Sequence, residues 1–343
     1  MPKKYRESVG DKGFADKPIG AGPFKWVDYK QDQWFELEAV ENHYRKTPEF
    51  KSMKLIWVPE ASTRLAMLKA GEADIAILAG AHIPQVKADP NLRLVQIKHI
   101  IGGVLAIADL AFPNENSPWL DRRVRTAASL AIDRKTICEK ILFNGYEPYG
   151  QPISPLTLGY DPSIKADPYD PEKAKKLLTE AGYPNGFDTL YNTGSTPSPA
   201  ELAILSNMQD VGIRIKLERY EGGAFYSALA GKKMRGLIPR NSWYDAERYA
   251  AADLTDAYMS TAPWVYYTTP EIEKAINDSQ YAITDAEQAV WGKKISRIII
   301  DSQISIFTWS RHSNFGVSEK IVEWKGQMGS YPATRFEYMK IKH

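Results

Sequence analysis

Short helices with well-marked ends alternate with short strands along most of the chain, and this alternation constrains the fold more than any other feature. The pairs Asp170-Pro171 and Ser198-Pro199 each place a capping residue before a proline at the first helical position, and Thr284–Glu287 is a capping box. Apolar and charged residues alternate over 213–217, which is typical of a strand with one buried face. Strands that alternate with helices predict an α/β protein.

The first part of the chain predicts a hairpin and then a strand, helix, strand unit. The segments 24–29 and 35–39 flank a polar turn, and the second of them alternates apolar and acidic residues, so we expect an antiparallel pair. Next come a short strand at 54–58, a helix that starts after Pro59 and stops at Gly71, and a strand at 74–77. Such a unit is suited to a parallel pair of strands.

A polar stretch rich in proline and asparagine, 112–118, predicts the connection to a second domain. Residues 124–132 repeat apolar side chains with the period of a helix, whereas prolines recur too often over 147–171 for a regular element. A long surface crossing is therefore expected there. The length of 343 residues agrees with two domains, at about 100 to 200 residues each.

Composition and charge exclude several classes of partner. The 44 basic and 42 acidic side chains leave a net charge of +2 without a long block of one sign, so no nucleic acid partner is expected. No uncharged apolar run is long enough to span a bilayer, the longest candidate being the broken stretch 100–112. Residues 1–6 lack the apolar region of a secretory signal peptide, which by itself favours a cytosolic protein or a mature or truncated chain.

The residues that usually hold metals or cofactors are scattered along the chain. Cys138 is the only cysteine, which excludes an internal disulfide and a site with several thiolates. The turn 20–23 begins like a dinucleotide fingerprint but lacks the third glycine and a preceding strand. We therefore expect no cofactor, no metal site and no assignable catalytic residue. None of the histidines has metal-ligand spacing to another: His43, His82, His99, His312 and His343.

The segment 240–249 is the most unusual in the sequence. Aromatic residues there alternate with charges of both signs, and neither a helical nor a strand period fits, so we expect a loop. Rigid rings supply stacking area, while arginine and carboxylate groups orient a polar ligand. The alternative is a solvated loop around a half-buried Trp243. The candidate ligand-binding residues are Arg240, Asn241, Trp243, Tyr244, Asp245 and Arg248.

Several segments carry a family resemblance when they are taken in order. They are 18–25 with 36–38, 59–65 with 71–75, 121–125 with 131–134, and 170–183. This series resembles the extracellular solute-binding proteins of ABC importers, family 5, the dipeptide-, oligopeptide- and nickel-binding type. The resemblance implies an α/β, periplasmic-binding-protein-like (type II) fold of two lobes, with lobe I at 1–109 and 303–343 and lobe II at 110–302. It also implies a ligand held between the lobes and hinges near 106–110 and 304–308.

The resemblance further implies partners and a ligand class. The partners would be a small-molecule ligand and an ABC permease in the membrane, and the location periplasmic or extracytoplasmic and membrane-associated. In peptide binders of this family, a loop resembling Trp-x-x-Asp holds the amino terminus of the peptide. Trp243 matches that loop, whereas Asp245 comes one residue early. A peptide is therefore the expected ligand, with a sugar, an opine or a metal chelate as alternatives.

Family members resemble this chain only from their middle onward. We therefore expect an N-terminally truncated fragment that lacks part of the first lobe, with apolar faces and strand edges left exposed and self-association as a way to cover them. Two readings from other classes stay open. One is a hydrolase that uses a carboxylate pair in the same cleft, because 42 acidic residues offer many such pairs. The other is a scaffold or chaperone that kept the fold.

Overall fold

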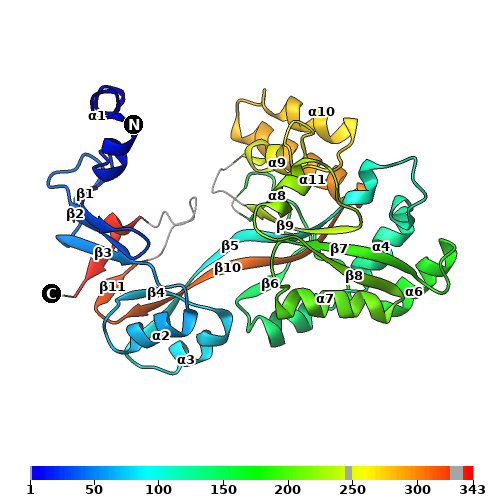
Figure 1. Cartoon of the computed structure of the whole chain (residues 1–343), viewed down its shortest axis with the longest axis horizontal. Helices are drawn as coiled ribbons and strands as arrows, with labels where there is room; N and C mark the ends of the chain where they lie inside the picture. Colours follow the sequence, from blue (N-terminus) through cyan, green and yellow to red (C-terminus); the bar gives the residue numbers. More distant parts are fainter. Residues whose placement is uncertain (1, 156, 244–248, 325–334, 343) are drawn as a thin grey trace. The chain divides into compact units, whose positions relative to one another are not determined.

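The computed structural model describes the chain except residues 1, 156, 244–248, 325–334 and 343, and it leaves out the side chains of 98–101, 241–243 and 253. The chain forms two compact units (Figure 1): unit 1 is Met1–Ile97 with Ser313–His343, and unit 2 is Lys98–His312. Two long strands, β5 (Leu92–Ile107) and β10 (Ser305–Ser318), run from one unit into the other. The lobe boundaries expected after residue 109 and before residue 303 stay a prediction.

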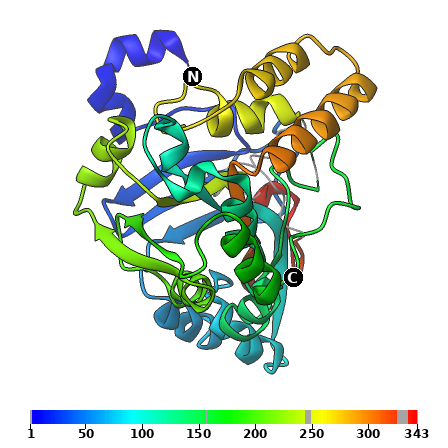
Figure 2. The ribbon, with the colours of Figure 1, turned by 90° about the vertical axis from the view of Figure 1, so that its right-hand side faces the viewer.

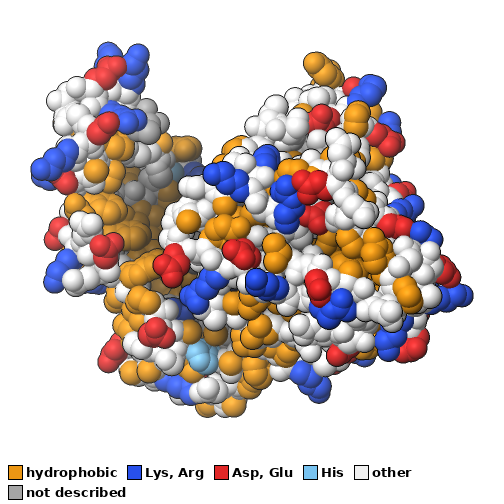
Figure 3. Space-filling view, turned by 45° about the vertical axis from the view of Figure 1, so that its right-hand side comes forward, with side chains coloured by type: hydrophobic (Ala, Val, Ile, Leu, Met, Phe, Trp, Pro, Cys, Tyr) orange, Lys and Arg blue, Asp and Glu red, His pale blue; other side chains and the backbone are white. Residues whose placement is uncertain are grey.

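Unit 1 begins with a helix, α1 (Lys3–Asp16), that the sequence did not predict and none of whose residues is buried. The predicted hairpin is confirmed: β1 (Phe24–Lys30) pairs antiparallel with β2 (Trp34–Ala39), which also pairs antiparallel with β3 (Ser52–Ile56). One face of this sheet carries Trp26 stacked on Phe35, at 5.4 Å between ring centroids. No residue of the three strands is buried, and hydrophobic side chains gather over this sheet in Figure 3.

The expected strand, helix, strand unit exists, but its parallel pairing is wrong. β3 is hydrogen-bonded antiparallel to β2, and β4 (Ile75–Ile77) pairs antiparallel with β10, with Val317 opposite Ile75. The partner of β4 comes from the far end of the chain, which a local pattern cannot reveal. Leu65 and Leu68 of α2 (Ala61–Lys69) pack with β4 in a small core. Unit 1 is completed by α3 (Ile83–Lys87), β11 (Ile321–Glu323) and β12 (Lys340–Ile341).

The sheet of unit 2 is mixed. β5 pairs antiparallel with β9 (Leu237–Trp243), whose other neighbour is β7 (Phe187–Thr193), and β7 pairs parallel with β8 (Ile213–Arg219). β6 (Tyr146–Pro148) pairs antiparallel with β10. The sequence did not predict β7. Its apolar pattern predicts two separate strands, 93–97 and 104–110, where the structure has β5, and two more, 304–309 and 314–317, where it has β10. Polar or glycine positions interrupt their apolar pattern, but they do not interrupt the backbone hydrogen bonds of a ladder.

Helices cover both sides of this sheet (Figure 1): α6 and α7 lie along one side and α8 to α11 along the other. The predicted helix starts are confirmed, because Asp170 caps α6 and capping boxes at Ser198 and Thr284 open α7 and α11. Helix α10, which the sequence missed, forms a hairpin with α11 that projects from unit 2 (Figure 2). The helices of unit 2 are α4 (Arg122–Leu130), α5 (Arg134–Thr136), α6 (Pro171–Glu180), α7 (Pro199–Asp210), α8 (Ala224–Ala230), α9 (Ala250–Tyr258), α10 (Pro270–Ser279) and α11 (Asp285–Ser302).

Candidate functional site

Strand β9 positions the predicted binding residues, so the expectation of a loop over 240–243 is wrong. Arg240, Asn241 and Trp243 lie on β9, where they face Val104, Gly103 and Ile101 of β5. The continuous hydrogen-bonded ladder with β5 holds residues 240–243 in an extended conformation, although their side chains do not alternate in polarity. Tyr244, Asp245 and Arg248 lie outside the described residues.

Side chains of β10 lie close to the backbone of β5 at Gly103, the residue that is paired with Asn241. A Cβ atom added to Gly103 would lie 2.5 Å from Thr308 Oγ1 and 2.6 Å from Trp309 Nε1. Only glycine therefore lets β10 place these side chains against β5. The glycine pair 102–103 inside a strand pattern is the sequence signal for this approach. Trp309 is a neighbour of the site that the pattern of aromatic and charged residues over 240–249 does not reveal.

Arg240 is a half-buried cation to which the described residues supply no counter-ion. Its guanidinium has no hydrogen bond or ion pair with any residue that the structure describes. Burial lowers the pKa of its guanidinium, and the nearby Tyr258 hydroxyl acts in the opposite direction. Burial raises the pKa of Tyr258 to about 12, so this phenol is neutral at pH 7.

A second cation lies close to Arg240 and adds to the positive charge. Burial, followed by the charge of Arg240, lowers the pKa of Lys232. The Lys232 ammonium group donates to the Val265 carbonyl and lies 5.1 Å from the centroid of the Tyr266 ring. The Tyr266 hydroxyl in turn accepts a hydrogen bond from the Met234 amide at 2.9 Å. This part of unit 2 is therefore suited to an anionic group.

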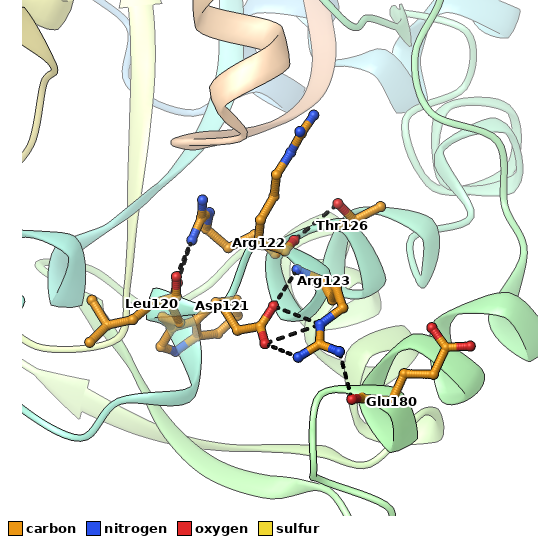
Figure 4. Close-up of polar contacts among 8 residues, drawn as sticks. Leu120, Asp121, Arg122, Arg123, Thr126 and Glu180 are labelled. Atoms are coloured by element: carbon orange, nitrogen blue, oxygen red, sulfur yellow. Dashed lines mark hydrogen bonds and ion pairs between the residues drawn. The ribbon is translucent and has the colours of Figure 1, made fainter.

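In contrast, Asp121 and Arg123 in the segment 121–126 form an ion pair with each other (Figure 4). The Asp121 carboxylate caps α4 by accepting from the Arg123 amide at 2.8 Å, and it also accepts from the Arg123 guanidinium at 2.6 Å. This guanidinium lowers the pKa of Asp121. Arg123 also donates to the Glu180 carbonyl at 2.7 Å, which ties α4 to α6. The role of this segment is structural.

Arg134, in the segment 131–134, is also structural. Its side chain is 3% exposed and donates to the carbonyls of Phe307 and Ser129, both at 2.8 Å. It donates as well to the Ser129 hydroxyl at 2.8 Å. Burial lowers the pKa of Arg134 to about 10, so its guanidinium stays protonated at pH 7. These bonds fix the first half of β10 to the helices α4 and α5.

The described residues offer little to a metal ion. Outside the masked positions, no group of three or more His, Cys, Asp and Glu side chains is placed to hold one. The thiol of Cys138 is buried, and this burial raises its pKa to about 12. No helix in the described ranges is long and apolar enough to cross a membrane.

A family model described as bacterial extracellular solute-binding proteins, family 5 Middle, matches residues 1–269. The chain is 29% identical to heme-binding protein A of Haemophilus influenzae over 300 residues, which are 84% of this chain and 53% of that protein. It is 31% identical to di/tripeptide-binding protein 2 of Pseudomonas aeruginosa over 214 residues, which are 60% of this chain and 39% of that protein. The chain thus spans about half the length of the curated relatives it matches.

The structure is similar to that of HbpA2 from Haemophilus parasuis, with a TM-score of 0.81 and 21% sequence identity. The similarity covers 100% of this chain and 69% of the other. At 21% sequence identity, this similarity shows that the two proteins share a fold.

Proposed function

The chain belongs to the bacterial extracellular solute-binding proteins of family 5, and we propose that it captures a peptide or a similar small polar solute and delivers it to the membrane permease of an ABC importer. The observation that carries the proposal is the family match over residues 1–269. The expected fold class, α/β of the type II periplasmic-binding-protein kind, is confirmed by the likeness to solved structures of such proteins. Relatives named for peptides, for glutathione and for heme support a small polar or amphipathic ligand.

We propose that the protein binds its solute without changing it chemically and that it works outside the cytoplasm. Proteins of this family are substrate-binding proteins that are periplasmic or extracellular. A ligand held by hydrogen bonds, stacking and ion pairs at micromolar affinity, about 8 kcal/mol, is captured and still released. No catalytic role is therefore assigned to the acidic residues of unit 2.

Arg240 is proposed to hold a carboxylate of the ligand. A planar guanidinium and a carboxylate form two parallel hydrogen bonds, and the pairing neutralises a charge that burial otherwise destabilises. Asn241 and Trp243 follow on the same strand, and Tyr244, Asp245 and Arg248 come directly after it in the sequence. We propose that these residues complete the ligand site, with Asp245 on the amino terminus of a peptide.

The proposed function is tested by titration of short peptides into the purified protein, followed by chromatography of the recovered peptide. Saturable binding with the peptide recovered intact supports a binding protein. Cleaved peptide would overturn it in favour of the hydrolase alternative. A panel of peptides, opines and metal chelates that gives neither a calorimetric signal nor a rise in melting temperature would favour the scaffold alternative.

Self-association is a separate proposal that concerns unit 1. The apolar face of the sheet formed by β1, β2 and β3 has no buried residue, and a contiguous exposed apolar face favours association. We therefore expect this chain to form dimers or larger species as protein concentration rises. A strictly monomeric, well-folded species in light scattering would contradict this.

A further inference from the structure

Arg311 is a second half-buried arginine of unit 2 for which no described residue serves as counter-ion. It lies on β10 between Ser310 and His312, which are both buried. Like that of Arg240, its guanidinium forms no hydrogen bond or ion pair with the part of the chain that the structure describes. A partly desolvated guanidinium without a partner is unfavourable in the ligand-free protein.

The geometry of β6 explains why Glu147, on the strand next to Arg311, does not neutralise it. β6 pairs with β10 so that Tyr146 is opposite Arg311 and Glu147 is opposite Ser310. Successive side chains on a strand point to opposite faces, so Glu147 lies on the face away from Arg311. Its carboxylate is 3.6 Å from His312 Nε2 on that other face.

Aromatic side chains surround Arg311 on its own face. Trp309 is two residues earlier on β10 and therefore points to the same side as Arg311. The rings of Trp309 and Tyr146 form an edge-to-face pair with centroids 6.1 Å apart. Rigid rings beside a free guanidinium give a surface that stacks on a ligand while the guanidinium binds an anionic group.

The surroundings of Arg311 are continuous with those of Arg240. β9 and β10 are the two neighbours of β5, so the two arginines lie on strands about 10 Å apart, which is twice the usual strand spacing. The Tyr258 hydroxyl is close enough to Arg240 to affect the pKa of its guanidinium, and it lies 3.4 Å from Ser305 Oγ. Ser305 is six residues before Arg311 on β10, so both side chains point to the same face of the strand. The two arginines therefore point to the same face of the sheet of unit 2.

We propose that Arg311, flanked by Trp309 and Tyr146, is a second anion subsite of the ligand site, and that the ligand is an acidic peptide or peptide-like solute. One carboxylate of the ligand pairs with Arg240 and another with Arg311. The inference rests on the proposed function and names the ligand class. A neutral peptide would leave one arginine unpaired and would bind more weakly.

Matched peptides that differ only by Glu or Gln test the subsite. The probes are Ala-Glu with Ala-Gln, and Ala-Ala-Glu with Ala-Ala-Gln, titrated by calorimetry at pH 7. We expect the wild-type protein to bind the Glu member of at least one pair at least tenfold more tightly. Arg311→Gln removes this preference while affinity for the Gln peptide stays within about threefold.

Control variants separate a local effect from a general one. Arg297→Gln makes the same change of charge on an exposed arginine of α11, with a side chain 54% exposed, and should keep the full preference for Glu. Arg311→Lys keeps the charge but loses the planar guanidinium, so we expect it to retain part of the preference. This variant keeps the test valid if Arg311→Gln lowers the melting temperature.

Each outcome bears on either the subsite or the function. Equal affinities for the Glu and Gln peptides in the wild-type protein, or a preference that survives Arg311→Gln, overturn the subsite and leave the proposed function intact. If no peptide of either kind binds, the acidic-peptide ligand is overturned. The proposed function then depends on whether the purified protein retains another small solute.

Discussion

Unit 2 holds buried and half-buried arginines in two settings that differ in their partners. Near α4 and α5, Arg125 and Arg134 are 8% and 3% exposed, and both donate hydrogen bonds to backbone carbonyls. On the strands β9 and β10, Arg240 and Arg311 have no such partner within the described residues. Burial of an arginine therefore does not reveal its role, whereas its hydrogen bonds do.

The two settings predict opposite consequences of substitution. Loss of an arginine that is bonded to carbonyls leaves buried acceptors unsatisfied, so the folded state is destabilised. Loss of an arginine without partners removes a desolvated charge and costs little stability. It should instead weaken the binding of an anionic ligand. Substitutions at both kinds of arginine, and at their neighbours, test this contrast.

Arg134→Ala should lower the free energy of unfolding by about 3 to 5 kcal/mol, because several buried carbonyl and hydroxyl acceptors lose their donor. Urea unfolding measures this change. Arg297→Ala, on the exposed face of α11, is the matched control and should change stability by less than about 0.5 kcal/mol. Equal stabilities of the two variants would remove the contrast between the two settings.

Arg240→Ala should weaken ligand binding by about 2.7 kcal/mol, which is about 100-fold, because a charged hydrogen-bond pair is lost. Its melting temperature should stay the same or rise. Calorimetry and a thermal melt on the same sample measure both quantities. A marked fall in the melting temperature with unchanged affinity would place Arg240 with the structural arginines.

Gly103→Ala tests the packing between β5 and β10. The new Cβ would lie 2.5 Å from Thr308 Oγ1, so we expect a loss of about 2 kcal/mol in the free energy of unfolding. Gly22→Ala is the control, because a Cβ there meets nothing within 4 Å. If urea unfolding shows equal stability for both variants, Trp309 is not held against β5 in the way described.

Trp243→Ala should weaken ligand binding at least tenfold, about 1.4 kcal/mol, without unfolding the protein, because an aromatic ring is lost from the predicted site. Trp57→Ala is a control in unit 1, where the side chain is 71% exposed. Calorimetric affinity that is unchanged in Trp243→Ala would count against this part of the site.

Local signals in the sequence predicted part of the fold. The capping residues Asp170, Ser198 and Thr284 and the hairpin of β1 and β2 act within a few residues along the chain, so their physics is visible in the sequence. The pairing of β4 with β10 joins residues from distant parts of the chain. No local pattern specifies such a pair, and for this reason the parallel unit was wrong.

The site was predictable only in part. The mixture of aromatic and charged residues drew attention to Arg240 and Trp243, and the glycine pair 102–103 was a signal that could have led to Trp309. The absence of a counter-ion at Arg240 or Arg311 within the described residues could not be predicted, because it depends on which side chains three-dimensional packing brings near. The direction of Glu147, away from Arg311, follows from the register of β6 on β10.

Native mass spectrometry of freshly purified protein tests most directly whether Arg240 holds an acidic ligand, since it detects a retained solute whatever its chemical identity. We predict one small acidic solute bound per chain, chemically intact, and its loss from Arg240→Ala under the same conditions. A spectrum in which the wild-type protein and Arg240→Ala retain the same solute to the same extent would contradict this role of Arg240.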